Sequence, residues 1–258
     1  MSGLKKQRSS TYARHFYEER RNRTTYAAQK VLSIVADLCN FESVVDFGCG
    51  TGTWLANTRS FGSKRLLGIE GPWLHQDLLD DPSIPIRLQD FEAEIQLSAH
   101  FDLAISLEVA EHLSQGRAPS FIRDICVSAR AVLFSAAIPH QGGDSHVNEQ
   151  WQGYWANLFL ENGYLPVDAV RPRIWQDERI PFYYRQNVLM YVPQEAYEDV
   201  ALRSQTLYRV PINLNIVHPR QYEKICGQEL GVKESISVMA RFPMTLFRAV
   251  QRRISERH

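Results

Sequence analysis

The chain has 258 residues, of which 44% are hydrophobic and 22% are charged, as in a soluble globular protein with one large core. Its 29 Lys and Arg residues balance 29 Asp and Glu residues, so the net charge of zero argues against a dedicated nucleic-acid-binding protein. The sequence lacks a run of about 18 apolar residues and an apolar leader after Met1, so we expect neither a membrane span nor a signal peptide.

The cysteines also bear on the compartment. Cys39, Cys49, Cys126 and Cys226 show no C-x-x-C spacing, which favours reduced thiols over a metal site or a disulfide framework. We therefore expect a cytoplasmic protein.

The first 30 residues are basic and rich in aromatic side chains. We expect residues 1–30 to form a helical lid over a ligand site, with Tyr17 among the residues that line it. The alternative is a surface helix whose aromatic side chains pack on the sheet.

An apolar strand followed by a glycine-rich turn is predicted at residues 43–52, Ser-Val-Val-Asp-Phe-Gly-Cys-Gly-Thr-Gly. Glycines at such a bend let a ligand approach the backbone closely, and a following helix offers free N–H groups. A dinucleotide-binding G-x-G-x-x-G motif would need its third glycine at position 53, where this chain has threonine. Gly52 comes one residue too early, and Asp46 places an acid inside the strand.

Further predicted strands also end in polar residues. The strand at residues 65–69 ends in Glu70, about 20 residues after the glycine turn, where a carboxylate can accept from both hydroxyls of a ribose. Alternatively, Glu70 is a surface acid before a Gly-Pro turn. Segments 84–88, 101–107 and 131–137 lead to Asp90, Glu108 and His140, so polar groups gather at one edge of a mostly parallel sheet.

This arrangement resembles motif I and the following strands of class I S-adenosylmethionine (SAM) methyltransferases. The resemblance implies an α/β fold with a Rossmann-like, doubly wound, seven-stranded sheet in three α/β/α layers, the last strand being antiparallel. It assigns residues 31–193 to the methyltransferase domain, about 139–160 to an acceptor-site insertion and 194–258 to a C-terminal extension. SAM would be held by Asp46, Gly48, Cys49, Gly50, Glu70, Asp90, Phe91 and Glu108. In this family the acid corresponding to Asp90 accepts from the adenine amino group, although an Asp here also suits a helix N-cap.

The segment Glu108-x-x-Glu111-His112 carries the sharpest chemical hypothesis. If it begins a helix, the three side chains share one face and can ligate Mg²⁺ or Mn²⁺. The string resembles the metal-binding residues of ubiquinone-pathway O-methyltransferases and plant small-RNA 2′-O-methyltransferases. Alternatively, Glu108 touches the cofactor and the acids form a solvated helix start. Catalysis would fall to His140, His112 and Glu111, because an alcohol acceptor needs a base.

The block after His140 is a candidate acceptor site. It contains His146, Asn148, Glu149 and Trp151 at the entrance of a predicted helix, whose Trp155 and Phe159 we assign to the core. From Ser106 to about Arg173 the chain resembles methyltransferases encoded beside bacterial surface-polysaccharide genes, which implies a sugar or sugar-linked acceptor.

The sequence thus predicts a SAM-dependent O-methyltransferase of a small, carbohydrate-containing acceptor in polysaccharide biosynthesis. Two alternatives stay open: an RNA 2′-O-methyltransferase, and a non-catalytic SAM-binding partner protein. A basic amphipathic stretch at residues 242–254 favours a packing helix or a homodimer contact over a membrane surface.

Overall fold

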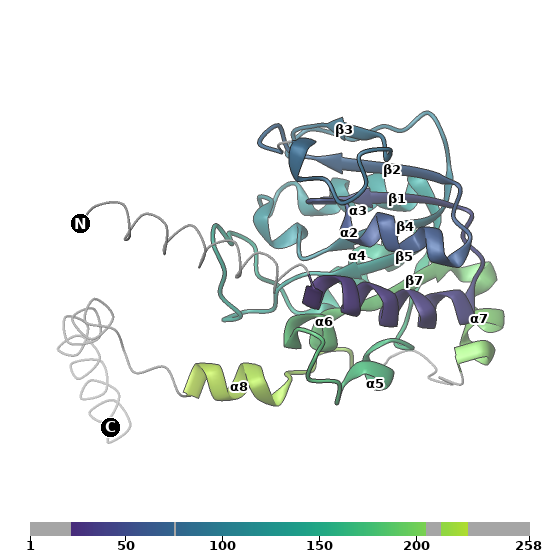
Figure 1. The fold of residues 1–258 in the computed structure, drawn as a ribbon. Coiled ribbons are helices and arrows are strands. Elements are labelled where there is room, and N and C mark those ends of the chain that lie inside the picture. Colours follow the sequence, from purple (N-terminus) through teal and green to yellow (C-terminus); the bar gives the residue numbers. More distant parts are fainter. Residues whose placement is uncertain (1–21, 75, 205–212, 227–258) are drawn as a thin grey trace, which may run out of the picture. The chain divides into compact units, whose positions relative to one another are not determined.

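Seven strands form one mixed sheet in the order β3-β2-β1-β4-β5-β7-β6 in the computed structural model, which describes residues 22–74, 76–204 and 213–226 (Figure 1). The strands are β1 Ser43–Phe47, β2 Arg65–Glu70, β3 Ile86–Leu88, β4 Phe101–Leu107, β5 Ala129–Ser135, β6 Tyr164–Val167 and β7 Leu189–Pro193. Strand β7 runs antiparallel to both β5 and β6, whereas β1 to β5 pair in parallel. The predicted seven-stranded Rossmann-like sheet is confirmed.

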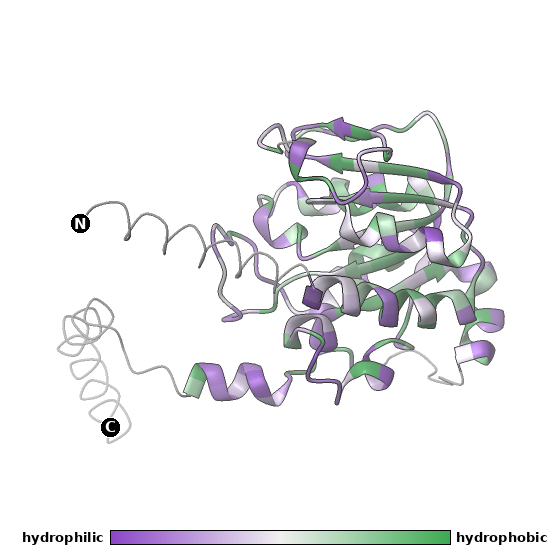
Figure 2. Cartoon of the chain, in the orientation of Figure 1, coloured by the Kyte–Doolittle hydropathy of each residue, from purple (hydrophilic) through white to green (hydrophobic). Residues whose placement is uncertain are grey.

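Helices cover both faces of the sheet, and each face has its own hydrophobic core. Neighbouring residues of a strand point to opposite faces, so Val44 belongs to one core and Val45 to the other. The first core takes side chains from a helix at residues 22–38 and from α2 Thr53–Thr58, α5 Arg171–Ile174, α6 Phe182–Asn187 and α7 Tyr197–Ser204. The second takes them from α3 Ala118–Ser128 and α4 Gln152–Glu161. Figure 2 shows the apolar strands between these helices. The predicted three layers are confirmed, and Trp155 and Phe159 are buried as expected.

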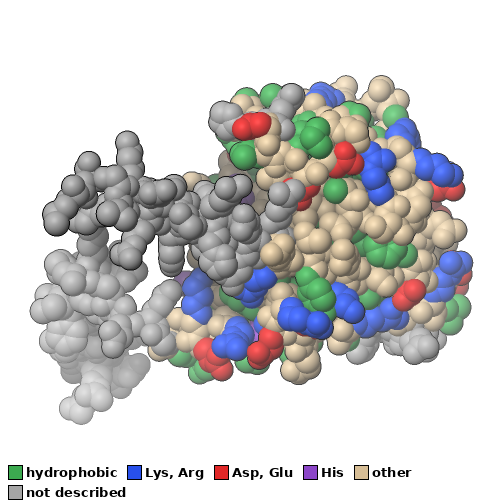
Figure 3. Space-filling view, in the orientation of Figure 1, with side chains coloured by type: hydrophobic (Ala, Val, Ile, Leu, Met, Phe, Trp, Pro, Cys, Tyr) green, Lys and Arg blue, Asp and Glu red, His purple; other side chains and the backbone are tan. Residues whose placement is uncertain are grey.

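The chain divides into two units, residues 1–218 and residues 219–258. The described part of the second unit is α8, Pro219–Cys226. Basic and acidic side chains are interspersed on the face shown in Figure 3, in keeping with the balanced charge. Among the described helices, none combines the length and the apolar character needed to cross a membrane.

The strand order reverses at β1 and β4, which lie side by side in the middle of the sheet. At such a point the turns leaving the two strands run in opposite directions, so a crevice opens at their carboxyl ends. Gly48 follows β1 with a φ of 84°, and a methyl group on its Cα would overlap Val109, two residues beyond β4. The two turns are therefore so close that the side chain of Val109 fills the space where a Cβ on Gly48 would lie.

Replacing Gly48 by alanine should destabilise the protein by about 2–4 kcal/mol, because the new Cβ needs both a left-handed backbone and the space of Val109. Urea unfolding of the purified variant measures this loss. Gly116→Ala is the matched control, since a Cβ there meets no atom within 4 Å. Equal stabilities of the two variants would contradict the contact.

Candidate active site

The glycine turn after β1 leaves open space beside its backbone. Gly50 and Gly52 have φ values of 55° and 78°, and a Cβ on either residue would meet no atom within 4 Å. The N–H groups of Gly48 and Cys49 donate to the carbonyl oxygen of Ile69, at 2.9 and 3.1 Å. The turn is thus fixed to β2 on one side and accessible to a ligand on the other.

Glu70, the last residue of β2, is held against this turn. Its Oε2 accepts from the N–H of Gly50 at 2.7 Å, and its Oε1 accepts from the N–H of Gly71 at 2.8 Å. Each carboxylate oxygen has two lone pairs, so each can accept one further hydrogen bond. Glu70 is therefore built into the turn and keeps the capacity to bind two hydroxyl groups.

Asp46 and Cys49 lie buried behind the turn. Burial, together with the charge of Glu70, raises the pKa of the Asp46 carboxyl well above its usual range. Burial also raises the pKa of the Cys49 thiol, so Cys49 is a neutral packing residue rather than a nucleophile.

Glu108, the residue after β4, has a strained backbone conformation. Its φ of 57° is left-handed, which is costly for a residue with a side chain. Its N–H donates to the carbonyl oxygen of Ser135 at 3.0 Å, and the following residues form a 3-10 turn, Ala110–His112. No α-helix starts at Glu108, so Glu108, Glu111 and His112 do not share a helix face. The left-handed residue turns the chain before helical hydrogen bonds can form.

Two amide side chains hold the carboxylate of Glu108. Gln141 Nε2 donates to Oε2 at 2.7 Å, and Asn187 Nδ2 donates to Oε1 at 3.2 Å. Burial raises the pKa of Glu108, while these donors and the contact with Ser135 act in the opposite direction by stabilising the anion.

Glu111, His112 and His146 form a compact cluster next to this position. Each offers one ligand atom, and these atoms all lie within 4.8 Å of one another. Glu111 Oε1 is 4.0 Å from His146 Nε2, and the two imidazole rings have centroids 4.8 Å apart. The metal ligands predicted from the sequence were Glu108, Glu111 and His112. In the structure Glu108 is hydrogen-bonded to two amides instead, and His146 is the third member of the cluster.

Burial controls the protonation of the cluster. Glu111 is fully buried and neither carboxylate oxygen has a hydrogen-bond donor among the described residues. Burial and the nearby Glu108 raise the pKa of Glu111 well above its usual range. Burial and His146 lower the pKa of His112, so this imidazole is neutral at neutral pH and can accept a proton.

Glu149 shapes the loop that carries His146. Its oxygens accept from the N–H groups of His140 and Gly142, both at 2.8 Å, and its Oε1 lies 2.9 Å from His146 Nδ1. Burial alone would raise the pKa of Glu149, but these hydrogen bonds outweigh it and lower the pKa. In the structure Glu149 therefore holds the loop together. The sequence predicts that it contacts the acceptor.

The other predicted acceptor-site residues lie around the same loop. His140 is exposed and has a φ of 67°. Asn148 is buried, and its Oδ1 accepts from Gln150 Nε2 at 3.0 Å. Trp151, 41% exposed, precedes α4 and offers an accessible aromatic face. Tyr17 and most of the predicted lid lie outside the described residues.

The residues predicted for the adenine lie beyond β3. Asp90 is exposed, and its Oδ1 accepts from the N–H of Glu92 at 2.9 Å, so it caps a turn and retains acceptor capacity. Phe91 is buried and packs edge-on against Phe121, with ring centroids 6.0 Å apart. Phe91 is thus mainly a core residue.

Sequence reasoning missed Tyr184, Gln141 and Asn187. Tyr184 packs edge-on against Trp54, and burial, Tyr183, Glu108 and Asp46 raise the pKa of its hydroxyl. Asn187 could have been predicted from its position in the sequence. It lies two residues before an antiparallel strand, whose start lies at the same edge as the carboxyl ends of the parallel strands.

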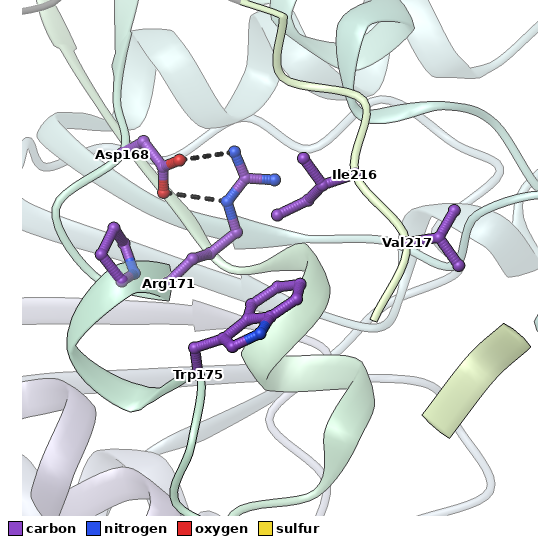
Figure 4. Close-up of a pocket in the computed structure, with 6 residues that line it drawn as sticks. Asp168, Arg171, Trp175, Ile216 and Val217 are labelled. Atoms are coloured by element: carbon purple, nitrogen blue, oxygen red, sulfur yellow. Dashed lines mark hydrogen bonds and ion pairs between the residues drawn. The ribbon is translucent and has the colours of Figure 1, made fainter. Parts of the chain in front are cut away.

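A separate hollow of about 450 Å³ is shown in Figure 4. Arg171 and Asp168 form a two-hydrogen-bond ion pair there, at 2.7 and 2.8 Å, beside Trp175, Ile216 and Val217. Arg171 also donates to the carbonyl oxygens of Gln186 and Leu214, so it ties α5 to the segment that follows α7. None of the residues predicted to be functional lines this hollow.

Comparison with known proteins agrees with the geometry. Residues 17–135 match a family described as a methyltransferase domain. The chain has the class I methyltransferase fold. DesVI from Streptomyces venezuelae has 15% sequence identity and a TM-score of 0.52, with 72% of this chain and 98% of that chain covered. The CcbJ methyltransferase from Streptomyces caelestis has 12% identity and a TM-score of 0.50, with 64% and 89% covered. The search of curated protein sequences found no match.

Replacing Glu111 by glutamine should stabilise the protein above pH 7. A carboxyl group whose pKa is raised by folding stabilises the native state at low pH and loses that contribution as pH rises through the folded pKa. The neutral amide avoids this loss, so we expect a Tm increase of roughly 2–4 °C at pH 8, for a gain of about 1 kcal/mol. Calorimetric scans at pH 5 and pH 8 in EDTA measure it. A variant less stable than the wild type at pH 8 would contradict the assignment.

Proposed function

We propose that this protein is a SAM-dependent methyltransferase that methylates an oxygen of a small, carbohydrate-containing acceptor. The observation that carries the proposal is Glu70, which is fixed to Gly50 and Gly71 beside the open side of the glycine turn. The family match and the fold support it, because both point to methyl transfer.

The cofactor would bind along the carboxyl ends of β1 and β2. The remaining lone pairs of Glu70 would accept from the two ribose hydroxyls, and the free edge of Gly50 and Gly52 would let the ligand lie against the backbone. Asp90 would accept from the adenine amino group. When bound, SAM supplies the methyl group that is transferred.

His112 would act as the base. A neutral hydroxyl is a poor nucleophile, so an acceptor alcohol must lose its proton as the new O–C bond forms. The lowered pKa of His112 keeps its imidazole unprotonated at neutral pH, and the carboxylate form of Glu111 beside it would stabilise the imidazolium that results. His140, which is exposed, would assist this proton transfer at the entrance of the site.

The carbohydrate assignment is supported by the loop between His140 and Trp151. Trp151 offers an accessible aromatic platform, a kind of side chain that sugars contact, while the buried Asn148 would support the loop from within. The resemblance to methyltransferases of polysaccharide gene clusters points to the same acceptor class.

S-adenosylhomocysteine (SAH) should bind the purified, cofactor-stripped protein in isothermal titration, and Glu70→Gln should weaken this binding about tenfold. Hydrogen bonds to a charged group contribute roughly 1.5–3 kcal/mol, and the variant removes the charge and replaces one of the two acceptor oxygens by a donor. Glu42→Gln, an exposed acid at the opposite end of β1, is the control. A wild-type protein that does not bind SAH would contradict the proposed function.

A second form of the site is favoured by the geometry of Glu111, His112 and His146, which would together hold a divalent cation. Two imidazoles and one carboxylate suit Mn²⁺ or Zn²⁺ better than Mg²⁺, which prefers oxygen ligands. In that form His112 is a ligand, and the cation would orient and polarise an acceptor oxygen.

Thermal unfolding with added Mn²⁺ or Zn²⁺ distinguishes the two forms. Binding to the cluster should raise the Tm by about 3 °C or more at cation concentrations 100-fold above Kd, and His146→Ala should abolish the shift. His100→Ala, at an exposed histidine elsewhere, should preserve it. An unchanged Tm in the wild type would leave His112 as the base without a metal.

A further inference from the structure

The candidate site collects acidic side chains that have no Lys or Arg partner among the described residues. They come from β1, from the end of β2 and from the turn after β4: Asp46, Glu70, Glu108 and Glu111. Within the described ranges, no Lys or Arg side chain forms an ion pair with any of them. The buried guanidinium groups of Arg117 and Arg171 are instead paired with Asp124 and Asp168. Burial raises the pKa of Asp46 and Glu111, so the negative charge that a cationic ligand would meet beside β4 falls to Glu108, whose amide donors stabilise its anion.

Glu108 occupies the junction between the two halves of the site. The next residue, Val109, contacts the glycine turn at Gly48, and Glu111 begins the histidine cluster three residues later. Under the proposed function, the group in transit passes between these two places. Glu108 adjoins both places along the chain, which makes its carboxylate the candidate to face the methyl donor.

A continuous set of buried amides fixes the direction of that carboxylate. Gln141 Oε1 accepts from Asn187 Nδ2 at 2.8 Å, which turns the Nε2 group of Gln141 towards Glu108. Asn187 Oδ1 accepts from Gln186 Nε2 at 3.1 Å, which turns Nδ2 of Asn187 towards Glu108 and Gln141. Gln186 is anchored in turn, because its Oε1 accepts from the N–H of His218 at 2.8 Å.

This set permits one orientation of each amide. If Gln141 or Asn187 were rotated by 180°, an amide oxygen would face the carboxylate and a donor would lose its acceptor. All members are at least 95% buried, so the mismatch could not be relieved by bulk water. The amides therefore hold both oxygens of Glu108 in place and support the strained backbone at this residue.

We infer that Glu108, oriented by Gln141 and Asn187, makes the site select the positively charged methyl donor over its neutral product. SAM carries a sulfonium that SAH lacks, so a fixed carboxylate attracts the donor and loses this attraction when the methyl group has left. Gln141 and Asn187 are positioning residues, since they act through Glu108. The inference rests on the proposed function and adds a basis for product release.

The test compares three ligands by isothermal titration in EDTA: SAM, SAH and sinefungin, an analogue that bears a protonated amine in place of the methylsulfonium. We expect the wild type to bind SAM and sinefungin more tightly than SAH. Glu108→Gln should reduce the ratio of SAM to SAH affinity about tenfold, and Gln141→Met about threefold, with SAH affinity nearly unchanged.

Thr58→Val is the control, because Thr58 is fully buried and its Oγ1 donates to the carbonyl oxygen of Leu55 at 2.6 Å, away from Glu108 and its amides. It should lower stability as Gln141→Met does and leave the affinity ratio unchanged. An equal fall in the ratio for Gln141→Met and Thr58→Val would show a purely structural role and overturn the inference. An unchanged ratio in Glu108→Gln would also overturn it, whereas wild-type protein that binds none of the three ligands would refute the proposed function itself.

Discussion

The close approach of Gly48 and Val109 is the constraint on which the site depends. Two neighbouring parallel strands end at the same height, and their turns can meet only because one of them has no side chain at the contact. The glycine turn then presents its free edge to solvent, while the other chain must bend sharply after β4. Glu108 makes that bend with a left-handed backbone, and this places the histidine cluster next to the glycine turn.

This geometry lowers the stability of the protein, because it buries carboxyl groups at the site. Asp46 and Glu111 lie inside the protein without a Lys or Arg partner among the described residues, and Glu108 adds backbone strain. Such features lower stability and commonly mark functional sites, where a ligand supplies the missing interactions. The rest of the fold offsets the cost through two continuous cores and well-paired ionic groups such as Arg171 and Asp168.

The sequence predicted the parts of the site that depend on local pattern. Apolar runs bounded by glycine or acids indicated each strand, and the spacing from Gly50 to Glu70 indicated that the two would meet. Residues brought together by long-range packing could not be found in this way. His146 reaches Glu111 from a loop 35 residues away, and Gln141 carries no motif. Asn187 could have been recognised from its position before an antiparallel strand.

The role of Glu149 has a consequence for how such a site can change over evolution. One carboxylate ties both ends of a short loop, through the N–H groups of His140 and Gly142 and the ring of His146. Two of the three residues between Gly142 and His146 are nevertheless constrained by the histidine cluster, because a Cβ on Gly143 would overlap the ring of His146 and the backbone of Ser145 is hydrogen-bonded to His112. Substitutions that suit new acceptors can therefore accumulate at the exposed Asp144, while the length of the loop stays fixed.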